Sequence, residues 1–255
     1  MQSNVNIGSA RIMRLDQMLV ARGLAPSRAR AQDLIKRRFV SVNGAICEKS
    51  AFDVTDEMPI AIAAEAPAYV SRGAEKLVAA LDRFGFDPSG RVALDIGAST
   101  GGFTEVLLQR GAARVYAVDV GTAQLHDRLK SDPRVISREN IDARALTEGE
   151  IPESVAAIVV DVSFISATKI LGAVLPFAAS GAWIVVLVKP QFEVGRKNVG
   201  SGGIVRDDAI RQGALDTVRD WLGRQPGWTI TGDLPSPILG GSGNAEMLLG
   251  ARYDD

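Results

Sequence analysis

VALDIGASTGGFTEVLLQRGAARVYAVDVG, residues 92–121, is the stretch of sequence that decides the fold. It contains a short apolar strand, a glycine-rich turn, a helix with an apolar face, and a second apolar strand that ends at Asp119. Glycines in such a turn let the backbone approach a bound nucleotide at the carboxyl edge of a parallel sheet. The stretch therefore predicts a nucleotide-type cofactor site on a doubly wound sheet.

Apolar strands and helical patterns continue to alternate toward the C-terminus. The strand-like runs are RVIS, AAIVVD and AWIVVLVK, with helices expected near Leu125, from Ser166 and from Arg206. Two final strands, GWTITGDLPSPI and NAEMLLGARY, are joined by LGGSGN without a helix, so the last strand is expected to run antiparallel at or near the sheet edge. We therefore predict an α/β fold: a Rossmann-like, mostly parallel sheet with helices on both faces.

The composition limits the classes of protein to which the chain can belong. At 255 residues and 46% hydrophobic content, it can bury the core of one large domain and a smaller one. Its single cysteine, Cys47, excludes an intramolecular disulfide and a multi-cysteine zinc cluster, which fits a reducing cytosol. No uncharged apolar run reaches about 18 residues, and the N-terminus lacks a signal-peptide core. We therefore expect a cytoplasmic, monomeric protein without a metal or a membrane span.

The net charge of −1 hides a basic N-terminal region. Residues 1–50 hold nine Lys and Arg residues against three acidic ones. This excess is typical of a phosphate-binding surface, although a solvated helix face explains the charge alone equally well. The candidate RNA contacts in this region are Arg14, Arg28, Arg30, Lys36, Arg37 and Arg38.

The same region has the pattern of a small α+β domain. One helix ends at Gly23, a basic helix follows the capping residue Ser27, and FVSVNGAI is a hairpin that turns at Asn43-Gly44. This order resembles the RNA-binding domain named after ribosomal protein S4, and the resemblance favours RNA as the partner.

An Ala/Pro-rich stretch, AAEAPAYVSRG, separates this region from the larger domain. The expected division is a tail at 1–12, the S4-type domain at 13–63, a linker at 64–70 and the larger domain at 71–255.

The spacing in the glycine turn favours S-adenosylmethionine over a dinucleotide. Side chains occupy the position where a dinucleotide fold places its second glycine against the pyrophosphate, and Asp95 adds a negative charge that would repel that group. A sulfonium centre and an ammonium group are instead favoured by such a carboxylate. Asp119 is expected to bind the ribose hydroxyls, and Asp142, in NIDAR, the adenine amino group. The candidate cofactor residues are Asp95, Gly97, Ser99, Thr100, Gly101, Gly102, Phe103, Asp119 and Asp142.

Other motifs limit which atom of a substrate can be methylated. VVDVSFIS lacks the Asn/Asp-Pro-Pro-aromatic turn typical of enzymes that methylate exocyclic base amines, and Cys47, in the small domain, is badly placed to be the nucleophile for a base carbon. The charged groups left at the strand ends are Asp161, Lys189 and Glu246, with Lys76 on a helix before the first strand. Lys189, which ends an apolar strand, is hard to explain by packing; Lys76 and Glu246 taken singly are ordinary surface residues.

Five motifs together resemble one family. YVSRGAEKL, DIGASTGGFTEVLLQRGA, VDVSFIS, LVKPQFEVGR and GSGNAE are similar to those of the TlyA family, whose members are often named hemolysins and are recognised as FtsJ-like methyltransferases of rRNA ribose 2'-hydroxyls at cytidine. The resemblance spans nearly the whole chain. It implies a class I S-adenosylmethionine-dependent methyltransferase sheet, ribosomal RNA or ribosomal subunits as partners, and a catalytic tetrad at Lys76, Asp161, Lys189 and Glu246.

A ribose hydroxyl is a weak acid, so its attack on a methyl group requires positioning and removal of its proton. Two roles are open for Lys189: a base made easier to deprotonate by its apolar strand and by Lys76, or a charged group that stabilises negative charge on the oxygen. Asp161 and Glu246 would orient the lysines. Arg196 and Lys197, in a glycine-rich loop, are further candidates for contact with RNA, and an ordinary surface loop is the alternative.

Two other hypotheses about function compete with the methyltransferase. One is a noncatalytic RNA-binding factor with a decayed cofactor site, and the other is a lytic protein, as family names suggest. Intact site positions disfavour the first, and the lack of a segment able to insert into a bilayer disfavours the second. Because the chain stops directly after its last strand, it resembles the shorter family form that acts on the large subunit only; the target nucleotides cannot be read from the sequence.

Overall fold

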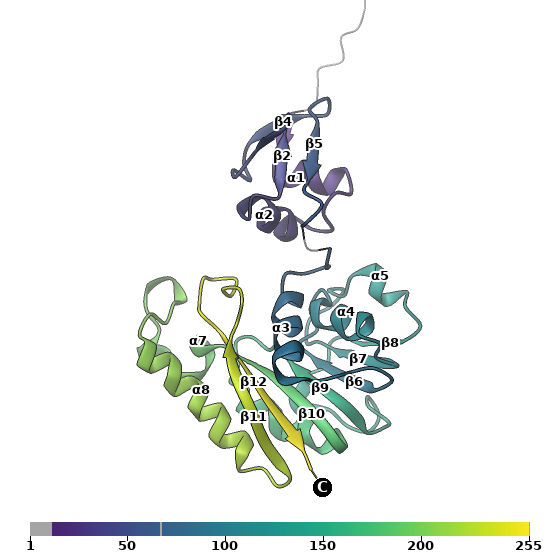
Figure 1. Cartoon of the computed structure of the whole chain (residues 1–255), viewed down its shortest axis with the longest axis vertical. Coiled ribbons are helices and arrows are strands. Elements are labelled where there is room, and N and C mark those ends of the chain that lie inside the picture. The colour runs from purple at the N-terminus through teal and green to yellow at the C-terminus, as the bar shows by residue number, and fades with distance from the viewer. Residues whose placement is uncertain (1–11, 67, 255) are drawn as a thin grey trace, which may run out of the picture. The chain divides into compact units, whose positions relative to one another are not determined.

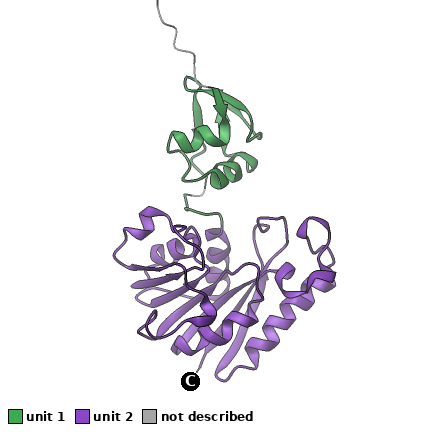
Figure 2. Ribbon diagram, turned by 180° about the vertical axis from the view of Figure 1, so that it is seen from behind, with its two compact units in different colours: residues 1–72 green, residues 73–255 purple. Residues whose placement is uncertain are grey.

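The computed structural model describes residues 12–66 and 68–254, and Figure 1 shows its helices and strands. It consists of two compact units, residues 1–72 and 73–255, which are coloured separately in Figure 2 and are called here the N-terminal and C-terminal units. All of the expected tail at 1–12 except Ile12 lies outside the described residues.

The N-terminal unit packs two helices against short strands. The three-stranded sheet has the order β3-β2-β5, and β1 pairs with β4 in a separate antiparallel ladder. The apolar face of α2 and the first helix meet these strands in one core that includes Leu15, Leu34 and Val40. The elements are β1 (Ile12–Arg14), α1 (Leu15–Ala21), α2 (Arg28–Lys36), β2 (Val40–Val42), β3 (Ala45–Ile46), β4 (Asp53–Thr55) and β5 (Ile60–Ile62).

Two local signals in this unit are confirmed. Ser27 caps α2, where its Oγ accepts a hydrogen bond from the backbone N–H of Arg30 at 3.2 Å. Asn43 and Gly44 have φ of 51° and 80°, as a tight turn between two antiparallel strands requires, and they join β2 to β3.

The C-terminal unit is built on a seven-stranded sheet with the order β11-β12-β10-β9-β6-β7-β8. Its strands are β6 (Val92–Ile96), β7 (Arg114–Val118), β8 (Val135–Arg138), β9 (Val155–Val160), β10 (Ala178–Val188), β11 (Trp228–Pro235) and β12 (Met247–Tyr253). Strands β6 to β10 pair in parallel, while β12 is antiparallel to β10 and lies one strand inside the edge. The predicted antiparallel last strand, at or near the sheet edge, is therefore confirmed.

Helices cover both faces of this sheet (Figure 1). On one face, α3 and α4 pack against β6, β7, β11 and β12; on the other, α8 packs against β10 to β12 and against α6. Alternate residues of one strand face the two layers: Leu94 belongs to the core cluster with α6 and α8, whereas its neighbour Asp95 bonds Thr104 of α4. The α-helices are α3 (Ala74–Phe84), α4 (Gly102–Gln109), α5 (Asp127–Lys130), α6 (Thr168–Val174), α7 (Pro190–Glu193) and α8 (Asp208–Gly223).

Short 3-10 turns complete the chain: η1 (Ala143–Ala145), η2 (Leu175–Phe177), η3 (Arg196–Asn198) and η4 (Ser201–Gly203). The helix expected near Leu125 is reduced to the single turn of α5. Because the parallel strands all end at one edge, the loops after β6, β7, β8, β9 and β10 gather there.

Candidate functional site

The glycine turn after β6 follows the path that the sequence predicted. Gly97 has φ of 82°, and a Cβ there would overlap the carbonyl group of Asp161 at the end of β9. Gly101 has φ of 98° and precedes the first residue of α4, where a side chain would overlap Leu129. Both positions therefore require glycine. The turn lies directly over the ends of β7 and β9.

A cavity of about 700 Å³ opens beside this turn. Its wall comes from the segments that follow β6, β7, β8 and β9, together with α6. The volume lies within the range of about 300–1,000 Å³ usual for small-molecule sites. Four predicted cofactor residues and one predicted catalytic residue line it: Gly97, Ser99, Asp119, Asp142 and Asp161.

Asp119 is held rigidly at the end of β7. Its Oδ2 accepts a hydrogen bond from the backbone N–H of Ser99 at 2.8 Å, and its Oδ1 accepts one from Gly121 at 2.7 Å. A carboxylate offers about four lone-pair positions, so each oxygen can accept a further bond from a ligand hydroxyl. The geometry therefore suits the expected role of Asp119 toward a ribose.

Asp142 lies across the cavity at the start of η1. It makes a two-pronged ion pair with Arg144, which also lines the cavity, and one Nη2···Oδ2 distance is 2.5 Å. Hydrogen bonds from the Arg144 side chain and backbone lower the pKa of Asp142 to about 2. Asp142 is therefore ionised at neutral pH, and both of its oxygens act as acceptors, as they do toward Arg144.

Asp95 occupies a different environment from the other candidates. It is fully buried beneath the turn, and its Oδ2 accepts a hydrogen bond from Thr104 Oγ1 at 2.6 Å. Burial raises the pKa of Asp95 to about 7, and its Oδ1 has no hydrogen-bond partner among the described residues. Asp95 thus supports the turn from below and is outside the cavity wall, as are Thr100, Gly101, Gly102 and Phe103.

Lys189 follows β10 and faces the loop after the neighbouring strand. Its Nζ lies 2.6 Å from Asp161 Oδ1 and donates a hydrogen bond to Ser163 Oγ at 2.9 Å. The side chain of Lys189 is 11% exposed and that of Asp161 is 22% exposed, so the pair is shielded but reachable. Because Asp161 and Ser163 line the cavity, the ammonium group lies at its border.

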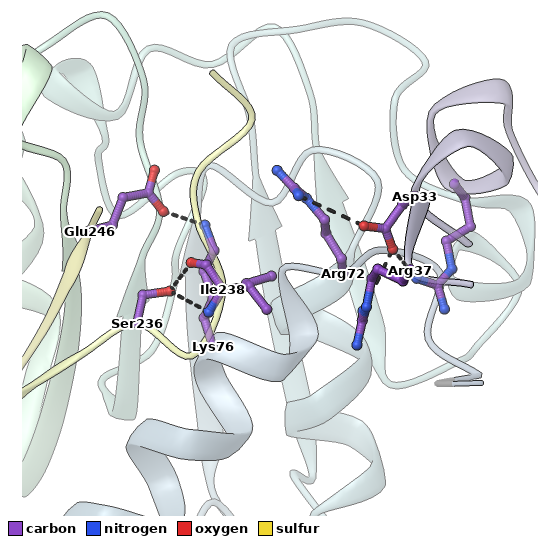
Figure 3. A network of polar contacts seen from close by, with 8 residues as sticks. Asp33, Arg37, Arg72, Lys76, Ser236, Ile238 and Glu246 are labelled. Carbon is purple, nitrogen blue, oxygen red and sulfur yellow. Dashed lines mark hydrogen bonds and ion pairs between the residues drawn. The ribbon is translucent and has the colours of Figure 1, made fainter. Parts of the chain in front are cut away.

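Lys76 and Glu246 form the second ion pair, shown in Figure 3. Lys76 Nζ lies 2.5 Å from Glu246 Oε2, and the two residues are 6% and 4% exposed. Glu246 directly precedes β12, whereas Lys76 lies in the first turn of α3. The structure therefore pairs the four expected catalytic residues as Lys76–Glu246 and Lys189–Asp161.

Strand register brings three of these residues to one edge of the sheet. Val188 pairs with Met247, so Lys189 and Glu246 each lie one residue beyond the same rung of neighbouring strands. Val160 pairs with Val186, which places Asp161 at the adjoining end of β9. Lys76 reaches this edge through its contact with Glu246.

Two aromatic rings, one of them exposed, lie close in sequence to the Lys189–Asp161 pair. Phe164 is 91% exposed with a φ of 66°, and its ring centroid lies 5.2 Å from that of Phe192. Both rings line a second cavity, of about 510 Å³, to which Arg196 also contributes, and Lys197 is exposed next to Arg196. A positive φ is uncommon for a residue other than glycine, and backbone strain of this kind gathers at functional sites.

The basic residues of the N-terminal unit divide into anchored and exposed groups. Buried Asp16 accepts hydrogen bonds from Arg14, Arg28 and Gln32. Burial alone would raise the pKa of Asp16, but these donors outweigh it and lower the value to about 2. The guanidinium groups of Arg14 and Arg28 are thereby oriented while their side chains stay 43% and 54% exposed.

Helix α2 does not present all of its cations to solvent. Arg30, one of the predicted RNA contacts, is 5% exposed and pairs with Asp33 at 2.8 Å. Its side chain is therefore largely shielded from solvent. Arg37 and Arg72 also approach Asp33, at 3.6 and 3.7 Å (Figure 3). Lys36 and Arg38 are exposed, and Arg38 lies 3.5 Å from Glu48.

Sequence reasoning missed several parts of the site. Ser163 and Phe164 lie within the motif VDVSFIS, but neither was predicted as a site residue. The positive φ of Phe164 cannot be recognised from the sequence pattern. Arg144 follows Asp142 by two residues, a spacing that allows the observed ion pair. Asn244, which is fully buried, accepts from the N–H of Val205 and donates to the carbonyl of Gly203, so it ties the glycine-rich loop to the segment before Glu246.

Two features of the described residues bear on other classes of function. Across residues 12–66 and 68–254, the helices are too short or too polar to cross a bilayer. Within the same described part of the chain, no group of three or more His, Cys, Asp or Glu side chains is arranged to hold a metal ion.

Two family models match the chain. One, described as FtsJ-like methyltransferase, matches residues 69–253, and the other, the S4 domain, matches residues 13–60.

Individual proteins match over nearly the full length. The 16S/23S rRNA (cytidine-2'-O)-methyltransferase TlyA of Mycobacterium tuberculosis is 46% identical over 95% of this chain and 91% of its own. Hemolysin A of Brachyspira hyodysenteriae is 40% identical over 92% of this chain and 98% of its own. A solved structure of a hemolysin-named protein from Streptococcus thermophilus aligns with a TM-score of 0.75 and 38% identity, over 97% of this chain and 90% of its own.

Proposed function

This chain belongs to the TlyA family of FtsJ-like methyltransferases with an S4 domain, and we propose that it methylates the ribose 2'-hydroxyl of cytidine in ribosomal RNA. The observation that carries the proposal is the Lys189–Asp161 ion pair, which lies at the border of the cavity beside the glycine turn. A relative named for this reaction matches 95% of the chain.

The cavity fits S-adenosylmethionine as the methyl donor. Asp119 would accept hydrogen bonds from the ribose hydroxyls. Asp142, whose ionised form Arg144 stabilises, would accept one from the adenine amino group. The backbone of the turn at Gly97 and Ser99 would line the remainder. When bound, this cofactor supplies an electrophilic methyl group whose bonding electrons remain on sulfur.

Lys189 would act on the acceptor oxygen as a charged group. Its ammonium donates a hydrogen bond to Ser163 and forms an ion pair with Asp161. Because an ammonium has three N–H donors, one can turn to the ribose oxygen, where it would stabilise the negative charge that develops as the O–H bond breaks and the O–C bond forms. Asp161 holds the ammonium in place, and the hydroxyl proton leaves to solvent.

The Lys76–Glu246 pair would set the geometry of the same edge. It fixes the first turn of α3 to Glu246, which lies opposite Lys189 on the neighbouring strand. The exposed ring of Phe164, with that of Phe192 beside it, offers a stacking surface for an RNA base that has left its base pair. Arg14, Arg28, Lys36 and Arg38 of the S4 domain, with Arg196 and Lys197 near the site, would bind the RNA backbone.

The testing experiment transfers labelled methyl groups from S-adenosylmethionine to purified large subunits, small subunits and naked rRNA. A ribose 2'-O-methyl group blocks alkaline cleavage at its own linkage, so alkali-resistant dinucleotides identify the acceptor and its base. The expected result is label at cytidine ribose with the wild-type protein and none with Lys189→Ala. The subunit that is labelled identifies the target.

Two results would overturn the proposal. Label on a base instead of a ribose would assign another acceptor atom. Bound cofactor without transfer to any of the three substrates would favour the noncatalytic RNA-binding factor.

A further inference from the structure

The segment between β9 and α6, residues 161–167, is bonded to both ends of the short helix α7. Lys189, which precedes α7, contacts Asp161 and Ser163 at the start of the segment. Glu193, the last residue of α7, contacts the far end of the same segment. Two points of attachment fix both the position and the direction of the segment, whereas one would leave it free to pivot.

Glu193 uses both carboxylate oxygens for this attachment. Oε2 accepts a hydrogen bond from Ser166 Oγ at 2.5 Å, and Oε1 accepts one from the backbone N–H of Ala167 at 2.8 Å. Ser166 Oγ also lies 2.8 Å from Thr168 Oγ1, in the first turn of α6. Glu193 thus forms hydrogen bonds with the two residues that directly precede α6.

Glu193 supplies the cap that α6 otherwise lacks. Ala167 is the residue before α6, and no side chain of its own caps the helix, so the Glu193 carboxylate accepts a backbone N–H that has no partner within the helix. The Glu193 side chain is partly buried, and burial raises its pKa above the ordinary value for a glutamate. The same two hydrogen bonds that cap α6 therefore also fix the end of residues 161–167 to α7.

We propose that Glu193 is a positioning residue for methyl transfer, which holds residues 161–167 so that Asp161 and Ser163 keep the Lys189 ammonium directed at the acceptor oxygen. This inference rests on the proposed function. Glu193 makes no bond to the reacting atoms and takes no proton in the reaction. Its loss lets the segment move, and Lys189 then loses its direction.

The test compares Glu193→Ala with Glu193→Gln in the full-length protein. Because misplacement of a catalytic group by about 1 Å costs roughly a hundredfold in rate, Glu193→Ala is expected to lower kcat about tenfold to a hundredfold at saturating RNA. The amide of Glu193→Gln still accepts from Ala167 and can donate to Ser166, whose hydroxyl turns to Thr168. Its kcat and cofactor Kd should stay within about threefold of wild type.

Glu153→Ala is the matched control. Glu153 likewise accepts a hydrogen bond from a hydroxyl, that of Tyr116 at 2.7 Å, and it also pairs with Arg114. Because Glu153 precedes β9, it lies at the end of the parallel strands opposite to the site. This variant is expected to lower the melting temperature without changing kcat. It separates loss of stability from loss of position.

A readout independent of catalysis keeps the inference distinct from the proposed function. Amide hydrogen exchange across residues 161–167 should be faster in Glu193→Ala and unchanged in Glu193→Gln. Unchanged exchange in Glu193→Ala would overturn the attachment itself, even if the wild-type protein methylated nothing. With faster exchange, full kcat in Glu193→Ala, or equal loss in both variants, would overturn the positioning role.

Discussion

The two ion pairs of the candidate site have the same chemistry and different surroundings. Lys76 and Glu246 are 6% and 4% exposed, whereas the side chains of Lys189 and Asp161 are 11% and 22% exposed and border the cavity. A buried pair offers a substrate little access, and removing one partner leaves an uncompensated charge. A pair at a cavity border keeps a donor available. Burial therefore favours Lys189 over Lys76 as the lysine that we propose to contact the acceptor oxygen.

Lys189→Ala is the substitution expected to have the largest effect on activity. It removes the group assigned to the developing negative charge, a loss worth about 10²–10³-fold or more in kcat. Cofactor affinity should change little, because Asp119 and the glycine turn remain. Parallel measurements of kcat, cofactor Kd and melting temperature check this. A large drop in melting temperature with Lys189→Ala would erase the distinction between the two pairs.

Lys76→Met tests the other pair through stability. Breaking a buried ion pair costs about 3–5 kcal/mol because Glu246 is left as a buried charge. The double variant Lys76→Met with Glu246→Leu should recover most of that loss, since a hydrophobic replacement of both partners is often tolerated. Denaturant unfolding of the single and double variants measures this. If the double variant were no more stable than the single, burial would not be what distinguishes this pair.

Asp95 extends the comparison to a buried carboxylate without a cation. Burial raises its pKa from 3.8 to about 7, so its contribution to stability is complete below about pH 4 and is lost as pH rises toward 7. The loss is on the order of 3–4 kcal/mol. Unfolding free energies measured from pH 4 to pH 8 should fall more steeply in the wild type than in Asp95→Asn. Equal slopes in the two proteins would show that Asp95 ionises as an ordinary aspartate.

These pairings also mark the limit of what the sequence predicts. The antiparallel direction of the last strand, the Ser27 cap and the Asn43-Gly44 turn depend on a few neighbouring residues, and all three were predicted correctly. The partner of Lys76 lies 170 residues away, so it depends on which strands become neighbours. The register between β9 and β10 then places Lys189 in contact with Asp161 and Ser163. The spacing of these residues along the chain does not predict which strands pair or in what register.

Helix α2 shows the same limit for charge. Its sequence counts Arg30 and Lys36 equally as candidates for contact with RNA, but only the packed structure distinguishes them. Arg30 is 5% exposed and bonded to Asp33, whereas Lys36 is exposed in the last turn of the helix. Periodicity locates an apolar stripe, but it does not show when an arginine beside that stripe turns inward to a carboxylate.

The smallest predicted effect applies the burial comparison to these two cations. Lys36→Ala should weaken rRNA binding only severalfold and reduce the slope of log K against log salt by about one, as loss of one phosphate contact requires. Arg30→Ala should lower the melting temperature and leave that slope unchanged, because its guanidinium pairs with Asp33 inside the unit. Binding titrations at several salt concentrations measure both slopes. A reduced slope in Arg30→Ala would mean that this arginine leaves Asp33 for the RNA, and that exposure in the free protein does not identify the residues that bind it.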